Sequence, residues 1–265
     1  MNEITNAQKK FIQQYKKDSL IVKLFRILLL VGFLSLWELT SYFGIVDSFI
    51  FSSPSKIVLC FWSMVIDKSI FLHIGITLYE TLFSFILVTL FSLLCAMLLW
   101  FSKRISEISE PFLVVLNSLP KSALAPLLIV WLGATQKTII VAGMSVAIFG
   151  SILSLYTSFM DTEQETLKLI YTLGGTRFHA LTKVVIPSSI PTVISNMKVN
   201  IGLCLVGVII GEFLAARSGL GYLIIYSSQV FKMDWLLMSI VILCVLAMGL
   251  YALINLVEKL YQKRF

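Results

Sequence analysis

The sequence predicts an all-α integral membrane protein with six transmembrane helices and a cytoplasmic helical segment between the fourth and the fifth. Two observations support this fold class. Of the 265 residues, 58% are hydrophobic and only 13% are charged, whereas a soluble domain carries about 25% charged residues. The hydrophobic residues are also grouped into runs of roughly 20, the length needed to cross a bilayer core about 30 Å thick.

The candidate spans cover residues 21–43, 74–101, 110–132, 138–160, 189–214 and 234–256. Six buried core helices could not all be interior in a chain of this length. Glu80 is the only charged residue of the second run between Ile74 and Trp100. The first run is too long for a cleaved signal peptide, and no small-residue cleavage site follows it. We therefore expect it to remain as the first span.

The positions of the basic residues predict the orientation of the chain. The net charge of +7 could also indicate a nucleic-acid partner, but the lysines and arginines are concentrated on one side of the spans. They lie around the start of the first span, after the second, between the fourth and fifth, and at the C-terminus: Lys9, Lys10, Lys16, Lys17, Lys23, Arg26, Lys103, Arg104, Lys168, Arg177, Lys183, Lys259, Lys263 and Arg264. The positive-inside rule then places both termini in the cytoplasm, and we expect lipid rather than nucleic acid as the surroundings.

Residues 1–20 are predicted to form a cytoplasmic amphipathic segment that precedes a transmembrane domain over residues 21–265. Phe11, Ile12 and Tyr15 fall on one helical face beside lysines, a pattern typical of an interfacial anchor. The longest outer connection, residues 45–72, contains Ser52-Ser53-Pro54-Ser55. This run predicts a turn followed by a helix that starts at the proline.

The cysteines and histidines do not indicate a metal or redox site. The four cysteines, Cys60, Cys95, Cys204 and Cys244, are widely spaced, and the two histidines lie in different segments. No pair has the spacing of a metal or redox site. The chain also lacks the Gly-x-x-x-x-Gly-Lys-Ser/Thr motif that cradles nucleotide phosphates. We expect no cofactor and no enzymatic activity of the chain itself.

Residues 161–188 form a cytoplasmic connection with apolar residues on the water side of the membrane. Asp161 or Thr162 can cap a first helix. Gly174-Gly175 breaks that helix, and Thr176 caps a second, short helix that runs to a proline. Most connections of this kind merely join two spans and are short and polar. A helical hairpin with apolar residues is instead suited to docking on a soluble partner.

The same segment resembles the permease subunits of bacterial binding-protein-dependent ABC importers. The signature of that family is an acid followed by two alanines, a glycine six residues after the acid, and later a hydrophobic residue followed by proline. Leu173-Gly174-Gly175-Thr176-Arg177-Phe178 is similar to the glycine centre, and Val184-Val185-Ile186-Pro187 to the exit. The acid–alanine–alanine part is replaced by Lys168-Leu169-Ile170, and Glu165, one turn earlier, is the candidate substitute for the acid.

Further stretches resemble the nitrate, sulfonate and taurine type of these permeases. Residues 119–133 are similar to a proline–alanine–proline–tryptophan–glycine segment, and residues 211–224 match a glutamate followed by a Gly-Leu-Gly turn. Trp37-Glu38, Gly44 and Ser53-Pro54-Ser55 also fit, whereas Glu80 stands where the group commonly carries a basic residue. The resemblance runs from about residue 37 to the C-terminus.

The resemblance implies a permease subunit in the bacterial inner membrane that forms the solute path of an ATP-driven importer. Its partners would be a cytoplasmic ATPase that binds the ATP, an extracytoplasmic solute-binding protein and a second permease copy, forming a homodimer. The solute would be a small organic anion such as a sulfonate, or a vitamin precursor. The candidate residues for coupling to the ATPase are Glu165, Lys168, Gly174, Gly175, Thr176, Arg177, Phe178 and Pro187.

The third and fifth spans supply the candidates for the solute path. Prolines inside a span free backbone carbonyls, which have to be satisfied inside protein or by cavity water. Lys121 could face an anionic solute in a cavity or could snorkel to the membrane surface, and the glycines could line the path or permit close helix packing. Glu80 and Glu212 could gate entry at the outer face or pair with basic residues. The candidate path residues are Asn117, Pro120, Lys121, Pro126, Gly207, Gly211 and Glu212.

Two other classes of function compete with this interpretation. A secondary transporter driven by an ion gradient predicts two related halves with broken helices and intramembrane acids. The sequence shows no convincing halves, and its acids lie mostly near the predicted membrane edges. A membrane-embedded enzyme requires clustered His, Asp or Glu ligands, which the sequence lacks. Co-purification of an ATPase would separate the importer from both alternatives.

Overall fold

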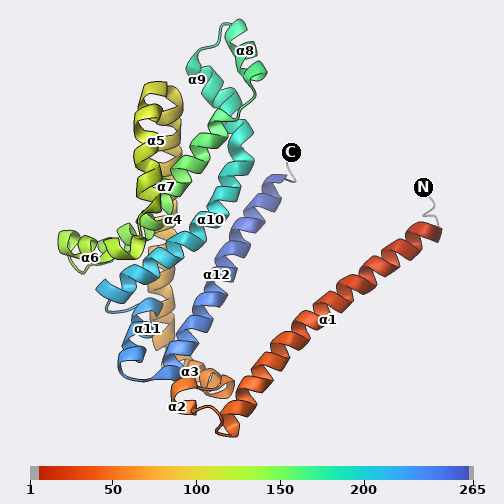
Figure 1. Cartoon of the computed structure of the whole chain (residues 1–265), viewed down its shortest axis with the longest axis vertical. Helices are drawn as coiled ribbons and strands as arrows, with labels where there is room; N and C mark the ends of the chain where they lie inside the picture. The colour runs from red at the N-terminus through yellow and green to blue at the C-terminus, as the bar shows by residue number, and fades with distance from the viewer. Residues whose placement is uncertain (1–5, 263–265) are drawn as a thin grey trace.

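The computed structural model describes residues 6–262 and is built from helices, without a β-strand in that range. Figure 1 shows α8 and α9 at one end of the bundle and α2 and α3 at the other. The helices are α1 (Asn6–Tyr42), α2 (Ser48–Phe51), α3 (Pro54–Ile66), α4 (Ser69–Phe101), α5 (Lys103–Ser118), α6 (Lys121–Leu132), α7 (Gln136–Met160), α8 (Gln164–Thr172), α9 (Arg177–Ala180), α10 (Ile186–Ala215), α11 (Leu220–Gln229) and α12 (Met233–Gln262). The predicted all-α fold class is confirmed.

Five helices are long and apolar enough to cross a membrane, and a sixth span exists if α5 and α6 are taken together. The first, second, fourth, fifth and sixth predicted spans correspond to α1, α4, α7, α10 and α12. The third, predicted over residues 110–132, corresponds to the second half of α5 and to α6. α5 and α6 meet at an angle of 97°, so the chain turns sharply in the middle of the predicted run.

The sharp turn between α5 and α6 follows from the Leu119-Pro120 dipeptide. Leu119 ends α5 in an extended conformation, with φ −63° and ψ 139°, because the ring of a following proline excludes the helical region. Pro120 is itself extended and serves as the N-cap of α6. The second proline of this stretch, Pro126, lies inside α6, so only the first one turns the chain.

The centre of the bundle is α7, which packs against both α4 and α10. Glycines make these crossings close. A Cβ on Gly143 of α7 would lie 2.7 Å from Ser84 Oγ of α4 and 2.8 Å from Val208 Cγ2 of α10. A Cβ on Gly207 of α10 would lie 2.8 Å from the Ala142 carbonyl oxygen. The helices therefore approach to a distance that no larger residue would allow.

Gly207 and Gly211 were candidates for the path lining, and the structure places both in the contact between α10 and α7. The hypothetical Cβ of Gly211 would lie 3.0 Å from Ile139 Cα. Close packing, the alternative that the sequence left open, is therefore the observed role of both residues. Their contribution to a solute path stays a prediction.

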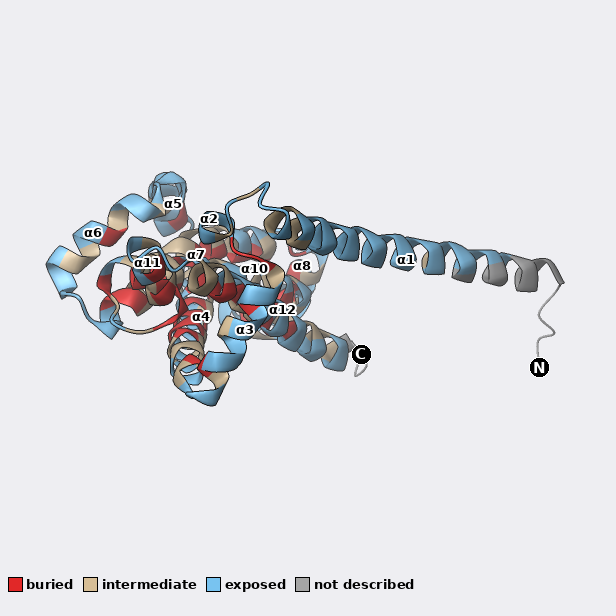
Figure 2. Ribbon diagram, turned by 90° about the horizontal axis from the view of Figure 1, so that it is seen from below, coloured by how far each residue is buried: buried red, intermediate tan, exposed pale blue. Residues whose placement is uncertain are grey.

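α1 stands away from the rest of the chain. Its apolar window, Lys17–Tyr42, contains no buried residue, and Figure 2 shows it extending from the bundle as an almost wholly exposed rod. α1 and α12 have their chain-terminal ends toward the end of the bundle that carries α8 and α9 (Figure 1). The helix continues through residue 20 without a break, so the predicted division into residues 1–20 and 21–265 stays a prediction; residues 1–5 lie outside the described range.

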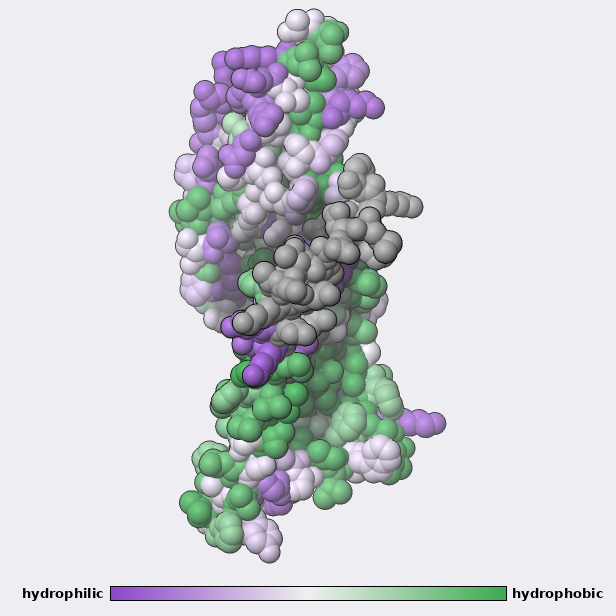
Figure 3. Space-filling model, turned by 90° about the vertical axis from the view of Figure 1, so that its right-hand side faces the viewer, coloured by the Kyte–Doolittle hydropathy of each residue, from purple (hydrophilic) through white to green (hydrophobic). Residues whose placement is uncertain are grey.

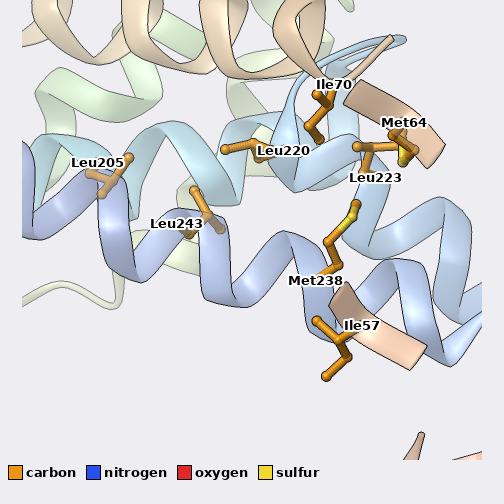
Figure 4. Close-up of a cluster of buried hydrophobic side chains, with 8 residues drawn as sticks. All are labelled: Ile57, Met64, Ile70, Leu205, Leu220, Leu223, Met238 and Leu243. Atoms are coloured by element: carbon orange, nitrogen blue, oxygen red, sulfur yellow. The ribbon is translucent and has the colours of Figure 1, made fainter. Parts of the chain in front are cut away.

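The end of the bundle at α2 and α3 is closed by a cluster of buried hydrophobic side chains (Figure 4). Pro54 is the first residue of α3, as predicted, and the Ser53 side chain caps the helix by accepting from the Lys56 N–H at 3.4 Å. Helices α3, α4, α10, α11 and α12 contribute to the cluster: Ile57, Met64, Ile70, Leu205, Leu220, Leu223, Met238 and Leu243. This packing fixes α11, a helix that the sequence did not predict as a separate element.

The polar and apolar surfaces are segregated along the long axis. Figure 3 shows hydrophilic residues gathered at the end that carries α8 and α9, and a mainly hydrophobic surface on the lower part of this face, below the grey atoms. A continuous apolar belt is what lipid covers in a membrane protein. α8 and α9 therefore lie beyond the apolar belt, next to water.

Candidate coupling and translocation sites

The turn between α8 and α9 requires both of its glycines. The Gly174 N–H donates to the Tyr171 carbonyl at 3.0 Å, and the Gly175 N–H donates to the Ile170 carbonyl at 2.9 Å. These two bonds define a Schellman motif, and Gly174 adopts its positive φ of +79°. A Cβ on Gly175 would lie 2.6 Å from Ile170 Cγ2. The predicted glycine break is confirmed.

The caps of the two helices differ in how well the sequence predicted them. Thr176 caps α9 as predicted: its Oγ1 accepts from the His179 N–H at 3.5 Å, and its own N–H donates to His179 Nδ1 at 3.1 Å. The part played by the histidine was missed because capping boxes usually carry Glu or Gln at that position. The predicted cap of α8 is wrong. Glu163 occupies the N-cap without a side-chain hydrogen bond, and Thr162 is buried one residue earlier.

A hydrophobic cluster anchors α8 and α9 to the ends of α4 and α7. Its buried members are Ala96, Leu155, Phe159, Leu167, Ala180, Leu181 and Val185. Arg177 adds a hydrogen bond between α9 and α4: its Nη1 donates to the Phe101 carbonyl at the end of α4 at 2.9 Å. Arg177 is also one of the candidate coupling residues; contact with the ATPase stays a prediction beside the internal bond that the structure shows.

α9 continues into α10 without a break. The sequence predicted that a proline would separate the short helix from the membrane span, and this is wrong. Residues Leu181–Val185 form a π-helical turn, and Pro187 sits in the first turn of α10. A proline lacks an N–H and clashes with the carbonyl four residues before it. The wider π turn removes this conflict, so Arg177–Ala215 is one candidate span of 39 residues.

The outer side of the α8–α9 turn leaves large apolar side chains in contact with water. Leu169, Leu173 and Phe178 are all exposed, Phe178 to 61%. Glu165 lies in the first turn of α8, where an acid is favoured by the helix dipole, and Lys168 borders a cavity of about 290 Å³ between α8 and the ends of α4 and α7. The predicted coupling residues thus gather in α8, α9 and the turn between them, except for Pro187, which lies in the first turn of α10.

At the opposite end of the bundle, Glu212 holds the Gly-Leu-Gly turn in place. The Gly221 N–H donates to Glu212 Oε2 at 2.5 Å, and Thr77 Oγ1 of α4 donates to Glu212 Oε1 at 2.6 Å. The Leu220 N–H in turn donates to Thr77 Oγ1 at 2.8 Å. The buried carboxyl therefore ties three segments together: α4, α10 and the start of α11.

Gly219 lets the turn approach the carboxyl of Glu212. Its φ of +119° is open to glycine but rarely to other residues. A Cβ at this position would lie 2.5 Å from the carboxyl carbon of Glu212. His73 closes the turn from outside, since the Gly219 N–H donates to its Nδ1 at 3.0 Å. The sequence resemblance found the glutamate and the turn, but it did not show that they touch.

Glu80 lies beside Glu212 and is also buried. Its side chain contacts those of Glu212 and Gln136, and its Oε2 has no hydrogen-bond partner among the described residues. It borders a cavity of about 210 Å³ that Arg217 and Ser218 also line. Neither glutamate forms an ion pair with a basic residue within residues 6–262. The partners of Glu212 are the Thr77 hydroxyl, the backbone N–H groups of Gly221 and Tyr222, and the side chain of Glu80. Gating by the two glutamates stays a prediction.

Lys121 is held by the last turn of α5. Its Nζ donates to the Asn117 carbonyl at 2.9 Å and to the Leu116 carbonyl at 2.5 Å, and it lies 5.5 Å from the centre of the Phe149 ring. The last carbonyls of a helix have no partner within the helix, and a cation there is favourable. The ammonium thus stabilises the sharp turn; contact of Lys121 with a solute stays a prediction, as does the role of Asn117, Pro120 and Pro126 in the path.

A hydrogen-bonded group that the sequence did not reveal crosses the centre of the bundle. Ser151 of α7 donates to Ser92 Oγ of α4 at 2.9 Å, and it accepts from the amides of Asn196 and Asn200 of α10, each at 2.9 Å. Hydrogen bonds of this kind join helices inside a membrane. Nearer the end of the chain, Lys198 of α10 forms an ion pair with Glu258 of α12.

Comparison with known proteins is consistent with this architecture. Residues 88–265 match the model of the family described as binding-protein-dependent transport system inner membrane component. A Haemophilus influenzae protein named as an ABC transporter permease is 29% identical over 87% of this chain and 94% of its own length.

Relatives with named solutes differ from one another. A Bacillus subtilis protein whose name assigns it to aliphatic sulfonate transport is 23% identical over 85% of this chain and 82% of its own length. The formylaminopyrimidine transport permease of Halalkalibacterium halodurans is 26% identical over 71% of this chain and 74% of its own length.

A solved structure shows the same fold. The MetNI methionine ABC transporter in inward-facing conformations aligns with a TM-score of 0.63 at 15% identity, over 71% of this chain and 93% of that one. The family match covers most of the chain, from the middle of α4 to the C-terminus. The chain therefore belongs to the inner membrane components of binding-protein-dependent transport systems, and it is a multi-pass permease subunit of an ABC importer.

Proposed function

We propose that the chain forms the solute path of the importer and that α8 and α9 transmit to it the motion of a separate cytoplasmic ATPase. One observation carries this proposal: α8 and α9 expose large apolar side chains to water while buried contacts anchor them to α4 and α7. An element that only joined two spans would gain nothing from exposed leucine and phenylalanine. A groove on a soluble partner would bury them.

The proposed docking uses few side chains. Phe178 projects from the first turn of α9 and Leu173 from the end of α8, so both could enter one groove beside the glycine turn. Aromatic residues at the centre of such contacts carry a large share of the binding energy. ATP would bind to the partner, because the chain lacks the phosphate-binding motif. We expect the chain itself to need no cofactor.

We further propose a homodimer with both termini in the cytoplasm. α8 and α9 would then lie in the cytoplasm, where the concentration of basic residues also places them. Most of the apolar surface of α1 is left uncovered by the other described residues, so it is free to lie against a second copy. One coupling element in each copy would suit two ATPase subunits related by the same symmetry. An extracytoplasmic binding protein would deliver the solute.

We propose that the solute is a small organic molecule, either a sulfonate-like anion or a vitamin precursor. The named relatives include a permease for aliphatic sulfonates and one for formylaminopyrimidine, which support both classes.

Phe178→Ala tests the coupling role. Loss of a central aromatic residue costs about 2 kcal/mol or more of binding free energy, which raises the Kd for the ATPase about thirtyfold. When the ATPase is present below that Kd, the amount that co-purifies with the permease should fall by about the same factor. ATP-driven uptake into liposomes should fall with it. Phe43→Ala is the matched control, since Phe43 is 68% exposed and directly follows the last residue of α1. That end of α1 lies at the opposite end of the bundle from α8 and α9 (Figure 1). Its uptake should equal that of the wild type.

Uptake by Phe178→Ala at the wild-type rate would contradict the docking assignment. The alternative, a transporter driven by an ion gradient, is tested with the purified chain alone in liposomes. Accumulation of solute there under a proton or sodium gradient, without any ATPase, would overturn the proposal as a whole.

A further inference from the structure

A hydroxyl-lined cavity of about 650 Å³ lies between the end of α7, the α7–α8 connection and the start of α10. None of the sites described above uses it. Its volume is within the range of pockets that hold small molecules, about 300–1,000 Å³. The lining residues are almost all hydroxyl or carboxyl side chains: Ser154, Thr157, Ser158, Asp161, Thr162, Glu163, Thr166, Val184, Ser188, Ser189 and Thr192.

Two hydroxyls of the lining have no partner. Thr162 is 8% exposed and Ser189 is 2% exposed, and neither Oγ1 of Thr162 nor Oγ of Ser189 has a hydrogen-bond partner among the described residues. Leaving a buried polar group unsatisfied costs about 1–3 kcal/mol. The two groups come from separate segments, the α7–α8 connection and α10, yet both border the same cavity. Both oxygens are buried in this conformation, and a rotation of either hydroxyl would turn its free bonding capacity toward a molecule inside the cavity.

The charges of the cavity select among molecules. Asp161 and Glu163 border it, and no lysine or arginine does so among the described residues. Lys103, Lys168 and Arg177 border the smaller cavity beside α4 instead, and Lys183, although next to the lining residue Val184, is not part of the lining. A sulfonate would meet two carboxylates of its own sign without a compensating cation. A neutral molecule with several donors and acceptors would meet hydroxyls that can both donate and accept.

We propose that this cavity binds the solute on the α8–α9 side of the path, and that it takes a neutral, hydrogen-bonding heterocycle in preference to a sulfonate. This inference rests on the proposed function and selects one of its two solute classes. The cavity is bordered by the start of α10 and by the residues next to α8, so a displacement of α8 and α9 changes its shape. Binding and release would thereby follow the state of the ATPase.

The test uses the complete transporter, with its ATPase and binding protein, in liposomes. Cys60, Cys95, Cys204 and Cys244 are replaced by serine, and Ser188→Cys then places one thiol in the exposed part of the lining. A membrane-impermeant maleimide is applied to the side of the membrane that carries the ATPase. The probes are an aminopyrimidine, riboflavin and ethanesulfonate at equal concentrations.

A neutral heterocycle present at about ten times its Kd should slow labelling of Ser188→Cys about tenfold by occupancy, and ethanesulfonate should leave it unchanged. Glu107→Cys, an exposed position near the start of α5, should be labelled at the same rate with every probe. Adding Ser189→Ala should weaken the protection about two- to tenfold, as expected for one hydrogen bond. It should not lower the yield of folded protein, because the hydroxyl has no hydrogen-bond partner within residues 6–262.

Equal or stronger protection by ethanesulfonate would overturn the choice of solute class. Absence of protection by all three probes, or protection that Ser189→Ala leaves unchanged, would overturn the assignment of the cavity. ATP-driven uptake by the cysteine-free transporter is measured in the same liposomes. If uptake is present and protection absent, only the cavity assignment fails; if uptake itself is absent, the proposed function fails.

Discussion

Replacing Gly219 by alanine should destabilise the protein far more than the same change at a glycine that has open space around it. Two separate costs arise at this position. The backbone has φ +119° and ψ 166°, a conformation that strains any residue with a Cβ, by about 1–3 kcal/mol. The added Cβ would also lie 2.5 Å from the carboxyl of Glu212, so the carboxyl or the turn has to move.

The second cost follows from the bonds that this movement breaks. Glu212 accepts from the Gly221 N–H and from Thr77 Oγ1, and the Gly221 bond belongs to the same turn as Gly219. Leaving one of these buried groups without a partner costs about 1–3 kcal/mol. Together the two costs predict that the free energy of unfolding falls by about 2–6 kcal/mol for Gly219→Ala.

The assay is reversible unfolding of the purified chain in mixed detergent and sodium dodecyl sulfate micelles, followed by circular dichroism. Gly202→Ala is the matched control. Gly202 lies inside α10, and a Cβ there meets nothing within 4 Å. The control should be neutral or more stable by up to about 1 kcal/mol, because alanine favours a helix over glycine. If Gly219→Ala loses no more stability than Gly202→Ala, the contact between the turn and Glu212 does not exist as described.

Two more predictions concern contacts between α10 and its neighbours. Asn200→Ala removes one donor to Ser151 and should lower the free energy of unfolding in micelles by about 0.6–1.7 kcal/mol; Val199→Ala on the exposed side of the same helix is the control, and an equal loss in both would count against the central network. Lys198→Glu leaves Glu258 without its cation and should cost about 1–3 kcal/mol. The exchanged pair Lys198→Glu with Glu258→Lys should recover most of that loss in the same assay, and failure to recover would show that the ion pair contributes little.

The sequence was sufficient for the elements whose signal is local. Hydrophobic length predicted α4, α7, α10 and α12 to within a few residues at their starts, because a bilayer requires a minimum apolar run. The Gly174-Gly175 break and the Thr176 cap were likewise predicted, since both depend on neighbours only three to five residues away. The same holds for Pro54, whose ring fits the first turn of a helix.

Features that depend on distant contacts could not be predicted in this way. The turn at Pro120 is a separate case: its cause is local, the proline that follows Leu119, but apolar length alone counts the run as one span. The interaction of Glu212 with the Gly-Leu-Gly turn joins positions that are adjacent in space because α10 ends and α11 begins beside α4. The hydroxyl-lined cavity combines Thr162 and Ser189, each an ordinary residue by its own local context.

The contacts of α10 indicate which parts of the chain move together when α8 and α9 move. The helical segment Arg177–Ala215 contains 39 residues, a length of about 58 Å at 1.5 Å per residue. It begins with α9, next to the α8–α9 turn, and contains Glu212 near its other end. Its crossing with α7 leaves no room beside Gly207, and packed interfaces of this kind shift as units rather than deform. Around this crossing α4, α7 and α10 should therefore move as one body, whereas the cavity at the start of α10 lies well away from it. Relative motion is then left to the sharp turn between α5 and α6 and to α1, which few contacts hold to that body.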